Sequence, residues 1–170
     1  VLELRRECAN SLLEMGFDGY GFGGWPIGED GRLVEMVYQV AELLPPDAPK
    51  HALGIGKPEN IVAAWRAGYT TFDSSLPTRD ARRKRLFVAR DFDSPLPNDG
   101  SFYQYVYLGD DKHRREDEPI DPGCSCPCCT RYSRAYLHHL FRVRDCLAYR
   151  LATLHNLQFF SRLMRALELD

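Results

Sequence analysis

Hydrophobic and polar positions follow two periods along the first 75 residues. Apolar residues recur at the three- and four-residue spacing of amphipathic helices in three segments, 2–15, 31–44 and 58–68. Short β-prone segments lie at 17–22, 50–56 and 69–75. Gly16 follows the first helical segment and Pro58 begins the third, as is typical of helix ends. Strands that alternate with helices through short connections predict an α/β fold with a parallel sheet.

The pattern changes in the second half of the chain. Residues 88–123 are rich in proline, glycine and charge, with one β-prone island at 102–108, and predict an irregular segment with a hairpin. Helical periodicity returns at Tyr132. We expect a break near His155 and Asn156, followed by a last helix.

The three predicted strands end in residues that are typical of a site. The residues there are Gly23-Gly24, Gly54-Ile55-Gly56 and Asp73-Ser74-Ser75. Taken singly, each glycine pair is more simply a turn, and Asp73 a helix cap. Because the carboxyl ends of parallel strands meet at one edge of a sheet, the three together favour a functional site with Asp73 as its carboxylate.

Composition and charge limit the classes of protein. A chain of 170 residues with 44% hydrophobic content fits one domain, or one domain with an appendage. The net charge of −2 argues against a molecule that binds polyanions over its whole surface. A local basic run lies at 79–85, where a solvated surface and a phosphate-binding surface are equally good interpretations. Without a membrane-length apolar run or a signal pattern, we expect a soluble, cytoplasmic protein that does not contact membranes.

Four of the six cysteines lie within positions 124–129. In a reducing compartment such a cluster favours a metal site over disulfides. The spacing C-x-C-x2-C supplies three thiolates, and tetrahedral zinc needs a fourth ligand. The candidates for this ligand are His138, His139 and His155, and spacing alone does not choose between them. A site with four protein ligands would be structural. For Cys8 and Cys146 we expect small core residues.

Three segments together resemble a known family. They are GFDGYGFGGWPIGE, LGIGKPENIVAAWRAGYTTFDSSLPTRDAR, and CSCPCCTRYSRAYLHHL with LHNLQFF. They look like the carboxyl-terminal half of the tRNA-guanine transglycosylases, which exchange guanine for a 7-deazaguanine base on the way to queuosine. The similarity runs from about residue 2 to the end and is weakest at 88–120.

The resemblance implies a fold and a cofactor. Residues 1–90 would be the last part of a (β/α)8 barrel, and residues 91–170 a zinc-binding subdomain with C-terminal helices. One structural zinc ion would be held by Cys124, Cys126, Cys129 and His155. The amino-terminal half-barrel would be a missing partner segment, so that the isolated chain would be inactive.

The resemblance also implies roles at the site. Asp73 would be the nucleophile that traps the ribose covalently. Gly23, Gly24 and Leu53 would contact the base, and the anticodon loop would be contacted by Gly54, Lys57, Thr78, Arg79 and Arg82. The implied reaction is exchange at the wobble position of tRNA, in a protein that can form a homodimer, as bacterial members do.

Four positions depart from the usual family pattern. Asp73 is followed by two serines where Cys-Val is usual, Trp25 replaces a leucine, and Leu53 replaces a methionine that stacks on the base.

Two alternative functions stay open beside tRNA exchange. One is a non-catalytic accessory subunit or zinc-stabilised RNA-binding module, and the other is a relative that inserts deazaguanine into DNA. The retained Asp73 favours an enzyme, because a binding module does not need a nucleophile.

Overall fold

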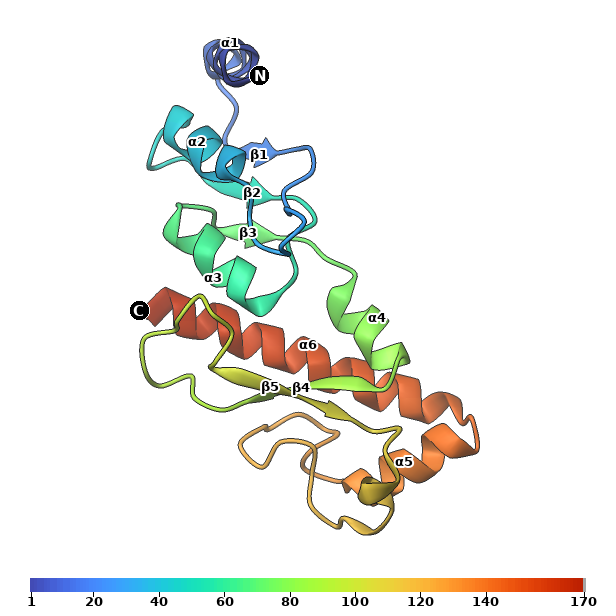
Figure 1. Ribbon diagram of the computed structural model, residues 1–170. Helices are drawn as coiled ribbons and strands as arrows, with labels where there is room; N and C mark the ends of the chain where they lie inside the picture. The colour runs from blue at the N-terminus through green and yellow to red at the C-terminus, as the bar shows by residue number, and fades with distance from the viewer. Residues whose placement is uncertain (170) are drawn as a thin grey trace. The chain divides into compact units, whose positions relative to one another are not determined.

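The structure is a computed structural model in which residues 1–169 are described, and it divides into two compact units, Val1–Ser74 and Ser75–Asp170. Each unit combines helices with its own small sheet (Figure 1). Among the described residues, every helix is too short or too polar to cross a membrane.

The first unit alternates strands and helices as the sequence predicts. Its elements are α1 (Leu2–Met15), β1 (Tyr20–Phe22), α2 (Glu35–Leu43), β2 (Lys50–Ala52), α3 (Pro58–Arg66) and β3 (Thr71–Phe72). The strands form a parallel sheet in the order β1-β2-β3, which confirms the predicted pairing. Each strand is shorter than its β-prone segment, and α2 begins four residues later than 31.

The helix ends of this unit follow local chemistry. Gly16 closes α1 in the left-handed conformation, with φ 73°, and its N–H bonds to the Leu13 carbonyl. Pro58 occupies the first turn of α3, where its missing N–H costs nothing. The core includes the fully buried Val37, Ala52 and Tyr69. The Tyr69 hydroxyl donates to the Val37 carbonyl at 2.9 Å, and burial raises the pKa of this side chain to about 12, so it stays a neutral donor.

Over its described residues, 75–169, the second unit contains a two-stranded antiparallel sheet and three α-helices. Its elements are α4 (Leu76–Arg82), β4 (Arg85–Ala89), β5 (Tyr103–Tyr107), a 3-10 turn η1 (Asp111–Arg115), α5 (Arg134–Arg142) and α6 (Cys146–Leu169). The β-prone island at 102–108 forms β5, and its partner β4 begins before the segment predicted to be irregular and runs two residues into it.

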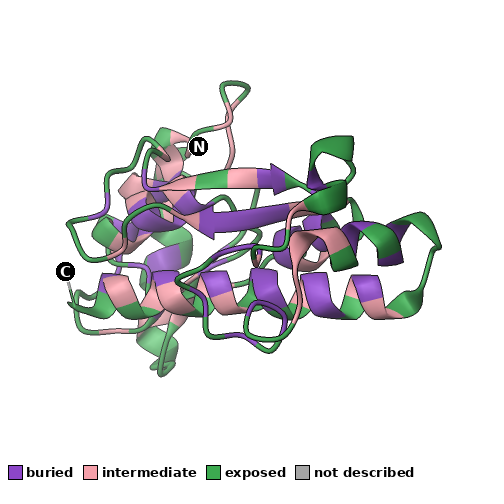
Figure 2. Ribbon diagram, turned by 90° about the horizontal axis from the view of Figure 1, so that it is seen from below, coloured by how far each residue is buried: buried purple, intermediate pink, exposed green. Residues whose placement is uncertain are grey.

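One face of the β4–β5 hairpin packs aromatic rings against α6. The Phe87 ring lies 5.2 Å from Phe159 and 4.9 Å from Tyr105, measured between centroids. Figure 2 shows β4 buried along most of its length and buried residues recurring along α6. Such rings bury large apolar areas, so this cluster is a main source of stability in the second unit.

Two expectations are wrong here. The chain does not break near His155 and Asn156, because α6 runs unbroken from Cys146 to Leu169. Both polar side chains are buried and find partners on β4, so they do not interrupt the helix. The real break precedes α6 at Arg144, whose φ is 59°. Cys8 and Cys146, expected in the core, are exposed.

Candidate functional site

The register of the parallel sheet brings the three predicted strand ends into one row. Phe22 pairs with Ala52, and Ala52 pairs with Phe72. The residues that leave the sheet at this row are Gly23, Leu53 and Asp73. The prediction that the three strand ends, which include Gly23, the Gly54 turn and Asp73, meet at one edge of the sheet is therefore confirmed within the first unit.

The Asp73 carboxylate is held at this edge by two donors. The Gly54 backbone N–H donates to Asp73 Oδ1 at 3.1 Å, and His51 Nε2 lies 3.2 Å from the same oxygen. Gly54 has φ 73°, a left-handed conformation that favours glycine, in the turn whose N–H reaches Asp73. The side chain of Asp73 is 63% exposed, so a ligand can reach it.

His51 is a site residue that sequence reasoning missed. It lies on β2 beside Thr71 in the sheet register, and its Nδ1 is 2.8 Å from the Thr71 hydroxyl. Thr71 and Asp73 are two residues apart and lie on the same side of the chain, so one imidazole reaches both. The signal was a histidine three positions before the predicted strand end at Gly54, a pattern too common to single out.

The residues predicted to contact the base lie beside Asp73 at the same edge of the sheet. Leu53 is 43% exposed, and a Cβ built on Gly21 would lie 3.1 Å from its Cδ1, so the Leu53 side chain leans over β1. Gly23 has open space where a side chain would project. Gly24 has φ 128°, and a Cβ there would meet the Arg5 guanidinium at 2.9 Å. Arg5 in turn donates to the Gly23 carbonyl, which fixes this glycine pair.

The residues predicted to contact RNA lie on both units. In the first unit, Lys57 is exposed and its ammonium lies over the Gly31 backbone. In the second unit, the first part of the basic run lies on α4, where Arg79 and Arg82 are three residues apart and both exposed. This spacing places them on neighbouring positions of the helix surface. Thr78 caps its own turn by donating to the Ser75 carbonyl.

One arginine of the basic run has a structural role instead. Arg85 pairs with Asp80 through two nitrogens, at 2.7 and 2.9 Å, and Asp80 is fully buried. A buried carboxylate requires such a partner. The run is therefore divided between an internal ion pair and exposed cations.

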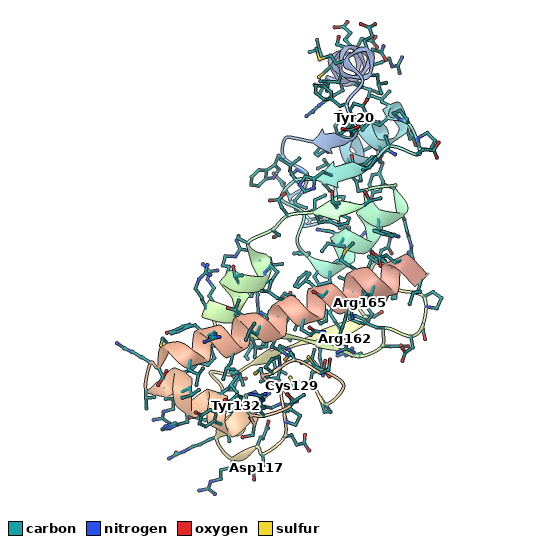
Figure 3. The ribbon with its side chains drawn as sticks, turned by 180° about the vertical axis from the view of Figure 1, so that it is seen from behind. Tyr20, Asp117, Cys129, Tyr132, Arg162 and Arg165 are labelled. Carbon is teal, nitrogen blue, oxygen red and sulfur yellow. The ribbon has the colours of Figure 1, made fainter. Side chains whose placement is uncertain are left out.

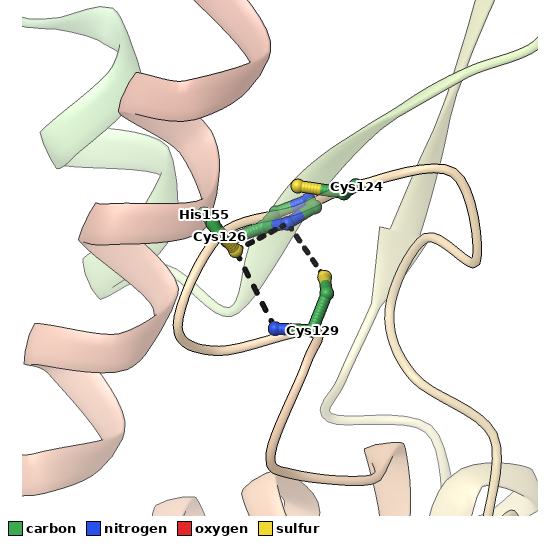
Figure 4. A group of neighbouring side chains, drawn as sticks. All are labelled: Cys124, Cys126, Cys129 and His155. Carbon is green, nitrogen blue, oxygen red and sulfur yellow. Dashed lines mark hydrogen bonds between the residues drawn. The ribbon is translucent and has the colours of Figure 1, made fainter.

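The second candidate site is a metal centre made of Cys124, Cys126, Cys129 and His155 (Figure 4). All four residues are buried, and their ligand atoms lie within 4.8 Å of one another. His155 Nδ1 is 3.2 Å from the Cys129 sulfur and 3.8 Å from the Cys126 sulfur. Zinc bound at usual lengths would separate its ligand atoms by about 3.5–3.8 Å. The geometry therefore fits a single tetrahedral ion.

The hydrogen bonds around His155 prepare it as a ligand. Its Nε2 lies 2.7 Å from the Phe87 carbonyl, which only accepts, so the proton is on Nε2. Nδ1 then turns its lone pair toward the sulfurs. A bond of this kind from the second ring nitrogen is usual for metal-binding histidines.

The ionisation of each thiol in the cluster depends on its neighbours. Hydrogen bonds from Cys124, Cys128 and Cys129 lower the pKa of Cys126, and the bond with Cys126 raises the pKa of Cys124. Negative charge is thus favoured on one sulfur at the expense of its neighbours. A divalent cation would allow all three ligand thiols to ionise.

The helix α6 ties the cysteine loop to the rest of the second unit. Arg162 on α6 donates to Asp121 at 3.0 Å, and Asp121 accepts from the Gly123 N–H at 2.8 Å, just before Cys124. Figure 3 shows Arg162 on this helix and Cys129 in the loop that precedes α5. The same helix therefore supplies a metal ligand and a clamp on the loop.

The residues left out of the predicted ligand set lie elsewhere. Cys128 is fully buried but outside the group of four. His138 is buried on α5 with Asp111 at 3.8 Å, and His139 is exposed on the same helix. The choice of His155, which spacing alone left open, agrees with the ligand set implied by the family resemblance.

Comparisons with known proteins match this chain along nearly its whole length. A family model described as queuine tRNA-ribosyltransferase matches residues 1–168. A queuine tRNA-ribosyltransferase from Psychrobacter sp. is 40% identical over 166 residues, and one from Syntrophobacter fumaroxidans is 41% identical over 166 residues. Each match covers 97% of this chain but only 41% of the relative. The chain thus spans about two fifths of the length of these relatives.

Proposed function

Because this chain belongs to the queuine tRNA-ribosyltransferase family, we propose that it forms the nucleophile-bearing and metal-binding part of an enzyme that exchanges guanine for a 7-deazaguanine at the tRNA wobble position. The observation that carries the proposal is the row of strand ends that presents Asp73 beside Gly23 and Leu53. An exposed carboxylate held by two donors suits covalent catalysis better than passive binding.

In the proposed reaction, an electron pair of the Asp73 carboxylate forms a bond to the ribose C1′. The C1′–N9 bond breaks, and guanine leaves with the electron pair of that broken bond and takes up a proton. The incoming deazaguanine then gives up its proton and attacks C1′ from the vacated side, and the carboxylate leaves. The tRNA strand stays intact throughout, and the target base must first be splayed out of its loop.

The remaining residues are proposed to bind substrate and RNA. Gly23 leaves room for a flat base against the backbone, the adjoining Gly24 backbone lies beside Arg5, and Leu53 offers an apolar contact in place of a stacking methionine. Lys57, Arg79 and Arg82 supply exposed cations for the phosphates of the anticodon loop.

We assign the metal as one structural zinc ion on Cys124, Cys126, Cys129 and His155. Three sulfurs and one nitrogen are the usual donors of closed zinc sites, and these four leave no position for substrate. Bound there, zinc would cross-link the cysteine loop to α6. In the proposed exchange, Asp73 and not the metal acts on the ribose.

The parallel strands would belong to a (β/α)8 barrel completed by a segment that corresponds to the amino-terminal part of the relatives. We propose that the isolated chain is inactive for lack of that segment. A cytoplasmic location and a homodimer agree with the proposed role in tRNA modification.

A chimera tests the proposal. This chain replaces the matching 166-residue segment of the Psychrobacter relative, and exchange of labelled guanine in tRNA is measured. We expect exchange, a covalent protein–tRNA adduct on denaturing gels, and loss of both in Asp73→Asn. Binding of tRNA without exchange would identify an accessory module instead, and an adduct that survives Asp73→Asn would exclude Asp73 as nucleophile. Exchange into DNA in preference to tRNA would favour the other alternative.

A further inference from the structure

We propose that His51 is a positioning residue for Asp73: its imidazole fixes the carboxylate so that Oδ1 is held and Oδ2 is the attacking oxygen. The inference rests on the proposed function of Asp73 and deepens it. Its basis is a chain of contacts from Thr71 through His51 to Asp73, with distances of 2.8 and 3.2 Å.

The hydrogen-bond roles along this chain follow from chemistry. An ionised carboxylate only accepts, so His51 Nε2 carries the proton that it donates to Asp73. In the neutral ring, Nδ1 then accepts from the Thr71 hydroxyl. The carboxylate therefore selects the ring tautomer, and the Thr71 hydroxyl fits that tautomer as a donor. The sheet register, which pairs His51 with Thr71, sets the position of the ring.

Both donors to Asp73 act on the same oxygen. The Gly54 N–H and His51 Nε2 lie 3.1 and 3.2 Å from Oδ1. Two donors on one oxygen fix the rotation of the carboxylate about its Cβ–Cγ bond, which otherwise turns freely on an exposed side chain. The other oxygen keeps its lone pairs for the ribose C1′.

This arrangement serves both halves of the exchange. In the first half, Oδ2 forms its bond to C1′ while guanine departs with the electron pair of the broken bond. Oδ1 then becomes the carbonyl oxygen of the ester and stays bonded to the same two donors. In the second half, these donors stabilise the carboxylate as it regains its negative charge and leaves.

Two variants of His51 separate positioning from general structure. A glutamine amide nitrogen reaches the place of Nε2, whereas an asparagine nitrogen reaches only that of Nδ1. In the chimera, His51→Asn should lower kcat for guanine exchange by about tenfold with little change in KM for tRNA, because a bond to a charged group is lost. His51→Gln should restore most of that loss. The matched control is His139→Asn. His139 is an exposed residue of α5, so this variant should leave kcat unchanged.

The proposal is overturned if His51→Asn exchanges guanine at the unaltered rate, or if glutamine and asparagine impair kcat equally. A chimera that lacks exchange altogether would count against the proposed function. In that case, nitrogen-15 NMR of the imidazoles in the 170-residue chain decides on His51. We expect its spectrum to report a proton on Nε2, and this signal to shift in Asp73→Asn. An unshifted signal would overturn the proposed contact.

Discussion

The backbone N–H of Gly54 donates to Oδ1 of Asp73 at 3.1 Å, so the turn after one strand holds the carboxylate at the end of its neighbour. The donor is a left-handed residue, since Gly54 has φ 73°, so the turn that presents this N–H favours glycine. The family resemblance assigns this loop to RNA contact, and the structure shows that the loop also forms a hydrogen bond to the proposed nucleophile. The predictions below separate such local geometry from overall stability.

Gly54→Ala should reduce exchange in the chimera more than it reduces stability. A Cβ would meet no atom within 4 Å, so the cost comes from the left-handed backbone, about 1–2 kcal/mol. Gly16→Ala is the matched control, because Gly16 has the same φ of 73° and equally open surroundings. We expect similar losses in the free energy of unfolding and a fall of about tenfold or more in kcat for Gly54→Ala alone. Equal activities would show that the Gly54 N–H does not matter for Asp73.

Removal of the metal should unfold the cysteine loop. Chelation should lower the melting temperature of the chain, since metal binding at such sites contributes directly to folding. Cys126→Ala should abolish the one equivalent of zinc measured by mass spectrometry. Cys128→Ala, at a buried cysteine outside the ligand group, should retain it. Unchanged melting in chelator, or equal zinc loss in both variants, would contradict the assignment.

Asn156→Ala should destabilise the second unit by about 2–4 kcal/mol, because each buried polar group left unpaired costs about 1–3 kcal/mol. The Asn156 carbonyl accepts from the Phe87 N–H, and its amide donates to the carbonyls of Pro77 and Arg85 at 2.9 and 3.1 Å. Urea unfolding measures the change. Arg165→Ala, at an exposed position of the same helix, is the control and should cost little. An equal cost in both variants would argue against these bonds.

Arg79→Ala and Arg82→Ala should weaken tRNA binding by the chimera. Each lost phosphate contact should reduce the slope of log K against log salt by roughly 0.7–0.9. Arg90→Ala is the control, since Arg90 is exposed but bonds to Gln104 outside the basic run. If all three variants changed the slope alike, α4 would have no special role in RNA binding.

Acid should weaken the second unit partly through Glu116. Hydrogen bonds from His113 and Arg134 lower the pKa of this carboxyl in the folded protein. In the unfolded chain a glutamate titrates near its ordinary pKa of about 4.3, so this stabilisation is complete above that pH and is lost as the pH falls through the folded pKa. Glu116→Gln should therefore show a flatter fall in stability below about pH 5.

Urea unfolding between pH 3 and pH 7 measures this difference. Glu118→Gln, at an exposed position nearby, should keep the steep acid dependence of the parent chain. Identical curves for both variants would contradict the role of Glu116.

The helices and strand ends that depend on residues close together in the chain could be predicted from the sequence. Apolar spacing, Gly16 and Pro58 predicted α1 and α3, and the glycine-rich strand ends predicted the row that includes Asp73. Contacts between residues far apart in the chain could not be predicted from it. His51 gains its place only from pairing with Thr71, twenty residues later.

The wrong expectation of a helix break has the same origin. His155 and Asn156 are polar and looked like a boundary, but their partners lie on β4, almost seventy residues earlier. Once those bonds form, the helix can bury both side chains without interruption. Local propensity is overridden wherever a distant backbone group satisfies a buried polar side chain.

The continuity of α6 limits how this chain can vary in length. His155 faces the cysteine sulfurs, Asn156 bonds to the strand backbone, and Arg162 clamps the cysteine loop, all from one uninterrupted helix. Inserting or deleting a single residue between these positions would turn one part of the helix by about 100° relative to the other. Natural length variation should therefore accumulate in the connection between β4 and β5 and spare this helix.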